Sequence, residues 1–374
     1  MQLAGKVFSA ITEVIHQAER KPADGALREV LRSGPLHPEE KAMVSRAVFT
    51  FFRWLGWMNP KHALRGQLEH AFELAETFNA DNRKVPDREL MEKALPAWVR
   101  AEVTLTPALL RELQSEPRLW LRARFGTGTK VAEKLQDTEP HVTIPDALWY
   151  RGWQDLYLTP EFHAGAFEIQ DLSSQIVSYV CDPAPGQTWW DACAGEGGKT
   201  LHLCELMEKK GLVWASDPAK WRLDVLKRRA ARAKVFNYRA KIWARTEQLP
   251  TRTKFDGVLV DAPCTGMGTW GRNPHARWTT EPADVAALAE LQGKILHSAA
   301  DAVKPGGKLV YSVCTLTQSE TVRVADQFEK SRPEFLPAPG KFPGGDLASP
   351  RITLLPQEWH SNGMFVAVWR RSSG

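Results

Sequence analysis

Two cysteines of this sequence lie in contexts that suit covalent catalysis. Cys264 belongs to the segment DAPCTGMGT, which begins at Asp261 after a short apolar run, and Cys314 belongs to the segment YSVCT after another such run. A thiolate can add to C6 of a cytosine ring, which turns the ring into an enamine and makes C5 nucleophilic. A carboxyl group with a raised pKa can donate a proton to N3 during that addition, and Asp261 is the candidate. The pattern favours chemistry at a pyrimidine carbon, because enzymes that methylate exocyclic amines usually carry Pro-Pro-aromatic here.

A glycine-rich turn precedes these segments. Asp191 leads into CAGEGGKT, residues 193–200. A phosphate-cradling GxxxxGK[ST] loop would need glycine in place of Cys193, and a dinucleotide-binding GxGxxG turn would need glycine or alanine in place of Thr200, so both motifs fail. Asp217 ends the next apolar run, where its carboxylate could accept both hydroxyls of a ribose. The combination suits S-adenosyl-L-methionine, a nucleoside without phosphate; the alternative is a packing turn that binds no ligand.

The elements that must position these residues are short apolar runs separated by helical stretches. The runs cover residues 188–191, 212–217, 255–261 and 308–312. Such alternation predicts an α/β, Rossmann-like doubly wound parallel sheet, in which ligands bind outside the carboxyl ends of the strands. We assign this domain to residues 167–374, preceded by a helical domain at 1–80, with apolar residues at helical spacing, and a small α+β module at 81–166.

Composition excludes several classes of protein. The chain has 374 residues, 43% hydrophobic and 25% charged, which rules out a single small module and wholesale disorder. It contains no apolar run long enough for a membrane span and no apolar N-terminal leader, so we expect a cytoplasmic protein without a membrane partner. Its five cysteines include no CxxC pair, so neither a metal site nor a disulfide is expected. Cys181 and Cys204 lie in apolar helical stretches and are expected to be core residues.

Positive charge is concentrated in one segment. The net charge is +5, but residues 199–254 hold 15 Lys and Arg against 5 Asp and Glu. The centre of the segment, with Lys227 and Arg228, could contact an RNA backbone or could be an ordinary solvated helix face.

The ordered set of motifs resembles the Nop/Sun (RsmB-like) family of RNA 5-methylcytosine methyltransferases. The resemblance includes QDLSSQ at residues 170–175, the glycine-rich turn, Asp217, both cysteine segments, and GMFVA at residues 363–367, and it covers about residues 167–369. The N-terminal helical region loosely resembles the NusB-like RNA-binding domain of RsmB-type members.

The resemblance implies a role for each matching residue. Cys314 would add to C6, Asp261 would assist at N3, and Cys264 would help to remove the C5 proton and release the enzyme. The reverse assignment of the two thiols stays open, because DNA cytosine-C5 enzymes use the thiol of their Pro-Cys element as nucleophile. The expected S-adenosylmethionine-binding residues are Cys193, Ala194, Gly195, Glu196, Gly197, Gly198, Lys199, Asp217, Arg222 and Asp261. The expected RNA-binding residues are Arg272, Trp278, Lys227 and Arg228.

The family layout favours ribosomal RNA as the substrate of a monomeric enzyme, with transfer RNA as the alternative. Three departures from the family pattern support a different hypothesis, an inactive RNA-binding assembly factor. Gly195-Glu196 replaces Ala-Pro, the acid expected near Trp243-Ala244-Arg245 is missing, and the run after the second cysteine is Gln318-Ser319-Glu320-Thr321. A methyltransferase for DNA or a small molecule is a third hypothesis.

Overall fold

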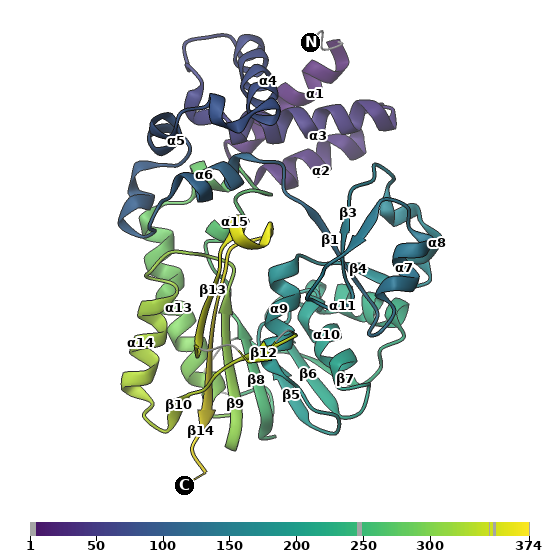
Figure 1. The fold of residues 1–374 in the computed structure, drawn as a ribbon, viewed down its shortest axis with the longest axis vertical. Coiled ribbons are helices and arrows are strands. Elements are labelled where there is room, and N and C mark those ends of the chain that lie inside the picture. The colour runs from purple at the N-terminus through teal and green to yellow at the C-terminus, as the bar shows by residue number, and fades with distance from the viewer. Residues whose placement is uncertain (1–4, 245–248, 344, 347–348, 374) are drawn as a thin grey trace. The chain divides into compact units, whose positions relative to one another are not determined.

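The computed structural model describes residues 5–244, 249–343, 345–346 and 349–373 (Figure 1). They form two compact units: one comprises Met1–Pro117 with Thr269–Pro282, the other Arg118–Gly268 with Ala283–Gly374. The predicted boundaries at residues 80 and 166 fall inside these units, and separate folding of the three predicted domains stays a prediction. None of the helices in the described ranges is both long enough and apolar enough to span a bilayer.

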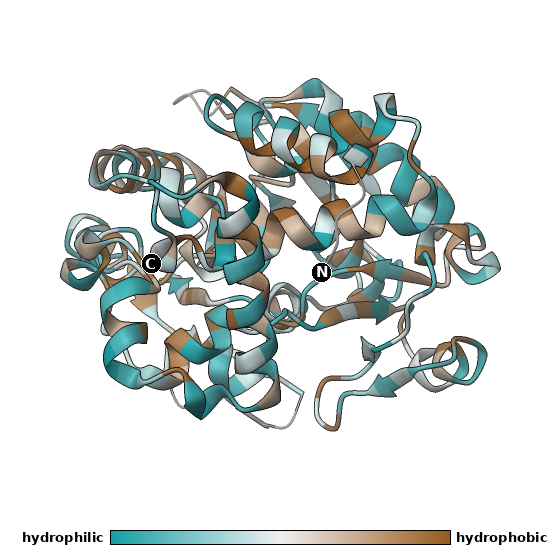
Figure 2. Cartoon of the chain, turned by 90° about the horizontal axis from the view of Figure 1, so that it is seen from above, coloured by the Kyte–Doolittle hydropathy of each residue, from teal (hydrophilic) through white to brown (hydrophobic). Residues whose placement is uncertain are grey.

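The first unit is helical, as its apolar periodicity predicts. Ile11, Val44 and Phe52 are among the buried residues of its core, and Figure 2 shows hydrophilic and hydrophobic residues interspersed along the helices. The third helix begins at Pro38, where the carboxylate of Glu40 accepts the His37 N–H at 2.9 Å. Its helices are α1 (Gly5–Ala18), α2 (Ala23–Ser33), α3 (Pro38–Arg53), η1 (Leu55–Trp57), α4 (Leu64–Ala80), η2 (Asn82–Lys84), α5 (Asp87–Lys93), η3 (Ala97–Ala101), α6 (Pro107–Gln114) and α12 (Ala276–Thr279).

The segment Thr269–Pro282 belongs to this helical unit although it follows the Cys264 motif in sequence. The fully buried Arg277 donates to the carbonyls of Trp270 and Leu113 and to the side chain of Gln114. The indole N–H of Trp278 donates to the Phe52 carbonyl at 2.7 Å. These bonds satisfy buried polar groups and fix the segment within the unit.

The second unit begins with a small antiparallel sheet of order β2-β3-β1-β4. The side chains of Leu121, Leu148 and Phe167 are buried in its core. Its elements are β1 (Leu119–Ala123), α7 (Gly128–Lys134), β2 (Thr138–Pro140), β3 (Ala147–Tyr150), η4 (Leu156–Leu158), α8 (Pro160–His163) and β4 (Phe167–Ile169).

An eight-stranded mixed sheet forms the centre of the second unit (Figure 1). The strand order is β10-β14-β9-β8-β5-β6-β7, and β13 also pairs with β14. The five neighbouring strands β7, β6, β5, β8 and β9 are parallel to one another, and β14 pairs antiparallel with β9. The predicted α/β doubly wound class is confirmed. The strands are β5 (Thr188–Asp191), β6 (Leu212–Asp217), β7 (Tyr238–Ile242), β8 (Phe255–Asp261), β9 (Val303–Val313), β10 (Phe335–Pro337), β13 (Arg351–Leu354) and β14 (Met364–Arg371), and β11 (Lys341–Phe342) pairs with β12 (Gly345–Asp346) separately.

Helices cover both faces of this sheet, and its central strands β5, β8 and β9 are accordingly mostly buried, whereas the edge strand β7 is largely exposed. One core contains Trp189 and Val213 with residues of α9 (Leu172–Cys181), α10 (Gly198–Leu206) and α11 (Lys220–Ala233). The other contains Trp190 and Val258 with residues of α13 (Pro282–Ala300) and α14 (Val322–Ser331). The remaining helices are η5 (Met267–Thr269) and α15 (Pro356–Trp359).

Gly268 has a packing role that a methyl group would disturb. Its carbonyl accepts the Gly363 N–H at 2.8 Å, and a Cβ at Gly268 would lie 2.0 Å from the Gly363 carbonyl oxygen. We predict that Gly268→Ala lowers the free energy of unfolding by about 2 kcal/mol, as overpacking does. Gly293→Ala is the control, because its Cβ would meet open space on α13 and should stabilise the helix slightly. Denaturant titration of both variants measures the difference, and equal stabilities would contradict the prediction.

Candidate active site

A cavity of about 400 Å³ opens at the carboxyl ends of the central strands. It is lined by Asp191 of β5, Asp217 of β6, Asp261 of β8 and both Cys264 and Cys314. Strand direction explains this grouping, since the carboxyl ends of parallel strands meet at one edge of the sheet. The volume falls within the range of small-molecule sites.

The two candidate thiols are in direct contact. The Cys264 and Cys314 sulfurs lie 3.3 Å apart, although the loop and strand that carry them are far apart in sequence. The pKa of Cys314 is lowered, above all by a hydrogen bond from Cys264 and also by the Lys199 ammonium, against burial and Asp261. The pKa of Cys264 is raised well above its ordinary value by its hydrogen bond to Cys314 and by burial. The contact itself allows either sulfur to donate, and the two opposite pKa shifts favour a Cys264 thiol that donates to a Cys314 thiolate.

Lys199 lies with the catalytic candidates. Its Nζ donates to Asp261 Oδ2 at 2.7 Å, and the Ser312 hydroxyl donates to Asp261 Oδ1 at 2.7 Å. Burial disfavours the charged amine, but attraction to Asp261 and hydrogen bonding with it outweigh burial and raise the Lys199 pKa. A proton donor and a carboxyl group are thus paired next to the Cys314 sulfur.

The glycine-rich turn borders the same cavity. Gly195 has a φ of +53°, and a Cβ there would meet open space, so the backbone itself lines the cavity. Gly197, with φ +87°, is needed for packing, because its Cβ would lie 2.5 Å from the Leu226 side chain. Glu196, which replaces the proline of the family pattern, is exposed.

Asp217 is 1% exposed and lies beside the turn. Its carboxylate accepts the N–H of Ala219 at 2.8 Å and of Gly195 at 3.2 Å, and Arg222 Nη1 lies 3.9 Å away. A carboxylate held by fixed backbone donors at a strand end can bind a ribose diol. The cavity size, the open backbone turn and this acid fit S-adenosylmethionine.

A network of buried ion pairs is connected to the glycine-rich turn. Glu168 on β4 is 1% exposed and pairs with Arg124, Arg229 and Arg232. Burial alone would raise the Glu168 pKa, but the three guanidinium groups lower it to about 2. Arg229 also donates to the Glu196 carbonyl at 3.0 Å. Two arginines of the basic segment therefore have structural partners.

The comparison with known families decides the classification. The family described as 16S rRNA methyltransferase RsmB/F matches residues 178–370, more than half of the chain. The chain belongs to the RsmB/F family. This is a family of S-adenosylmethionine-dependent RNA cytosine methyltransferases, so the resemblance inferred from the motifs is confirmed.

Individual relatives agree with this classification. A probable ribosomal RNA small subunit methyltransferase B of Synechocystis is 33% identical over 299 residues, or 76% of this chain and 66% of the relative. The corresponding protein of Bacillus subtilis is 36% identical over 219 residues, or 56% of this chain and 49% of the relative. The chain thus spans about half to two thirds of their length. The crystal structure of PH0851 covers 99% of this chain with a TM-score of 0.80 and 23% identity, which confirms the fold.

The predicted RNA-binding residues of this RsmB/F member lie in different surroundings. Lys227 and Arg228 are exposed on α11. Arg272 and Trp278 belong to the helical unit, where the Trp278 indole is already bonded to Phe52. RNA contact by all four residues stays a prediction. Arg245, near the missing acid of the family pattern, lies outside the described residues.

The structure adds contacts of Lys199 and Glu320 that the sequence did not indicate. The sequence places Lys199 at the cofactor by its position directly after the glycines; in the structure it lines the same cavity and donates to Asp261. Glu320 was noted only as part of a departure from the family pattern, yet it is fully buried and bonded to the residue after Cys264. An acid among three threonines close behind Cys314 was the signal that could have indicated it.

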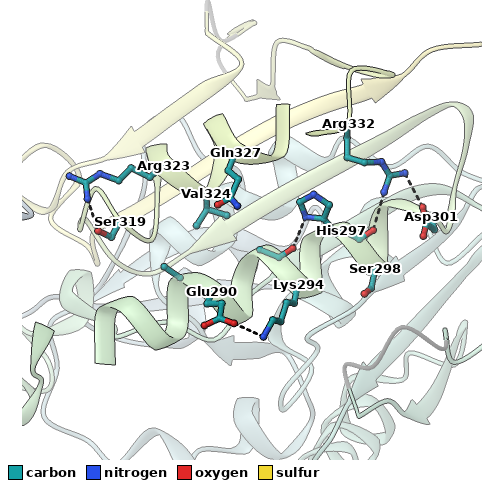
Figure 3. A pocket seen from close by; sticks show the side chains of 12 residues that line it. Glu290, Lys294, His297, Ser298, Asp301, Ser319, Arg323, Val324, Gln327 and Arg332 are labelled. Carbon is teal, nitrogen blue, oxygen red and sulfur yellow. Dashed lines mark hydrogen bonds and ion pairs between the residues drawn. The ribbon is translucent and has the colours of Figure 1, made fainter. Parts of the chain in front are cut away.

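A second groove, of about 1070 Å³, lies between α13 and α14 (Figure 3). Two pairs of oppositely charged side chains line it, Glu290 with Lys294 at 2.6 Å and Arg332 with Asp301 at 2.9 Å, and Arg323 donates to the Ser319 hydroxyl. None of its lining residues is a predicted site residue.

The Lys199 charge should control the reactivity of Cys314. We predict that Lys199→Met slows alkylation of Cys314 by iodoacetamide several-fold near neutral pH, because loss of the ammonium raises the Cys314 pKa and less thiolate is present below it. Peptide mass spectrometry measures the rate at each cysteine. Lys220→Met is the matched control, since Lys220 is 74% exposed and pairs only with Asp224 in the described structure. Equal rates in both variants would exclude this role for Lys199.

Proposed function

We propose that this protein methylates C5 of cytosine in RNA, with small-subunit ribosomal RNA as the substrate. The observation that carries the proposal is the 3.3 Å contact between the Cys264 and Cys314 sulfurs in the cavity that also holds Asp261 and Asp217. Membership of the RsmB/F family supports RNA cytosine as the target, and the ribosomal names of the two relatives support the choice of RNA.

The proposed reaction begins with the Cys314 thiolate. Its sulfur bonds to C6 of a cytosine that has left its base stack, while the Asp261–Lys199 pair delivers a proton to N3. S-adenosylmethionine, when bound by the glycine-rich turn and Asp217, supplies the methyl group to C5. Once Cys314 is bonded to carbon, Cys264 gives up its own proton to water in the cavity and, as a thiolate, takes the C5 proton. N3 returns its proton to the Asp261–Lys199 pair as the bond between Cys314 and C6 breaks, which regenerates the Cys314 thiolate.

The two thiols have separable roles in this scheme. We predict that Cys264→Ala, incubated with substrate RNA and S-adenosylmethionine, accumulates an enzyme–RNA adduct that survives denaturing electrophoresis, because it retains attack and loses release. Cys314→Ala should form no adduct, and both variants should lose most turnover. The opposite pattern would exchange the two roles, and adduct formation by neither variant would contradict the covalent mechanism. Bisulfite sequencing of the product RNA identifies the methylated cytosine.

Asp217 tests the cofactor site independently of RNA. We predict that Asp217→Ala weakens S-adenosylmethionine binding at least tenfold in titration calorimetry, because a buried acceptor for the ribose is lost. Asp224→Ala is the control, since Asp224 lies on the exposed face of α11 and pairs with Lys220 and Lys227. If the unmodified protein bound no S-adenosylmethionine, an RNA-binding assembly factor on a methyltransferase scaffold would be the better explanation.

A further inference from the structure

Glu320 is a buried acid for which the proposed reaction has no role. It lies between β9 and α14 and is 0% exposed. In the part of the chain that the structure describes, no cationic nitrogen lies within ion-pair distance of its carboxyl group. Burial of a carboxylate without a counter-charge is costly unless donors surround it, so its partners reveal what it does.

Within the described residues, the donors to the Glu320 carboxyl group come from the loop that carries Cys264, from the residues that follow Cys314 and from α13. Oε1 accepts the Thr265 N–H at 2.8 Å and the Gln292 amide at 3.0 Å. Oε2 accepts the Thr317 hydroxyl at 2.7 Å and lies 3.3 Å from the Thr315 hydroxyl and in contact with that of Thr265. A single carboxyl group thus joins the loop that carries Cys264 to the segment that follows Cys314.

Gln292 completes the connection on the other side of Cys264. Its amide also donates to the Pro263 carbonyl at 2.9 Å, and the Tyr311 hydroxyl lies 3.0 Å from Gln292 Oε1 and 2.6 Å from the Glu320 carbonyl. Cys264 therefore stands between two anchored residues, Pro263 and Thr265. Because Cys314 directly precedes Thr315, the same bonds fix the distance between the two sulfurs.

The charges around the sulfur pair are arranged unequally. The Cys264 pKa is raised first by the hydrogen bond with Cys314, then by burial and by the negative charge of Cys314. The negative charge of Glu320 raises it further. On the Cys314 side, the Lys199 ammonium lowers the pKa while Asp261 opposes it. Glu320 thus adds negative charge on the Cys264 side, whereas Asp261 and Lys199 act on the Cys314 pKa in opposite directions.

We propose that Glu320 is the positioning residue that makes the two thiols unequal: it anchors the Cys264 loop to the end of the Cys314 strand and places negative charge on the Cys264 side of the sulfur pair. The proposal rests on the proposed function for its catalytic meaning, since it explains why Cys314 attacks and Cys264 serves release. Glu320 contacts neither the cavity residues Asp217 and Asp261 nor, by this assignment, the substrate.

The test measures alkylation of each cysteine by iodoacetamide, from about pH 6 to about pH 10, with peptide mass spectrometry and without RNA or cofactor. In the unmodified protein we expect Cys314 to react first and Cys264 only at higher pH. Glu320→Gln keeps the shape and removes the charge, so the onset of Cys264 alkylation should move to lower pH and the preference for Cys314 should fall several-fold. Glu290→Gln, an exposed acid on α13, is the matched control and should behave like the unmodified protein.

The fully buried Cys181 and Cys204 report on the fold in the same experiment, because burial raises their pKa and shields them. If Cys181 and Cys204 react in Glu320→Gln, the fold of that variant has opened. The test is then made with Thr317→Val, which removes one hydrogen bond to Glu320 but keeps its charge. This variant should show a smaller loss of the preference of alkylation for Cys314. An unchanged Cys264 onset and unchanged preference in a variant whose Cys181 and Cys204 stay protected would overturn the proposal.

The outcomes separate this proposal from the proposed function. Loss of preference in Glu320→Gln, in a protein that methylates no RNA, would support the role of Glu320 and contradict the function. If the protein does methylate RNA, Glu320→Gln should lower kcat several-fold with little change in KM for RNA, because Glu320 acts through Cys264 and does not contact substrate. A variant with lowered kcat but unchanged thiol preference would contradict the positioning role.

Discussion

The contact between two sulfur atoms is the constraint on which the proposed chemistry depends. At 3.3 Å the Cys264 and Cys314 sulfurs are within hydrogen-bond distance, and their contact raises the pKa of Cys264 and lowers that of Cys314, which makes Cys314 the more reactive thiol. Neither sulfur has this property alone, since an isolated buried cysteine such as Cys181 is held as an inert thiol. The fold must therefore bring the loop that carries Cys264 and the strand end that carries Cys314 into contact.

Buried polar groups provide this accuracy. Glu320 and Gln292 tie the two cysteine segments together, and Gly268 allows a close backbone approach to Gly363 beside them. Below the glycine-rich turn, Glu168 and its arginines hold the turn by way of Arg229 and the Glu196 carbonyl. Such networks fix one geometry because a half-broken network leaves buried groups unsatisfied, which is costly. The site is thus surrounded by hydrogen bonds and ion pairs that fix its shape.

The basic segment shows how tertiary structure divides a sequence signal. Its arginines and lysines looked alike as candidates for RNA contact, yet Arg229 and Arg232 face inward to Glu168 while Lys227 and Arg228 face solvent. Similarly, Trp278 follows the Cys264 motif in sequence but is bonded within the helical unit. Charge and aromatic content indicated a region of the chain. The helix face and the partner of each side chain then separated the residues with structural partners from those that are exposed.

The sequence by itself determined the fold class, the strand ends that carry Asp191, Asp217 and Asp261, and the placement of Cys264 and Cys314 at one edge of the sheet. It could do so because apolar runs of strand length, alternating with helices, leave few topologies open, and parallel strands end on the same side. Only the tertiary structure decided that Lys199 pairs with Asp261 and that Glu320 joins the two cysteine segments. These pairings connect residues distant in the chain through side-chain rotamers and burial, which no local pattern of residue types records.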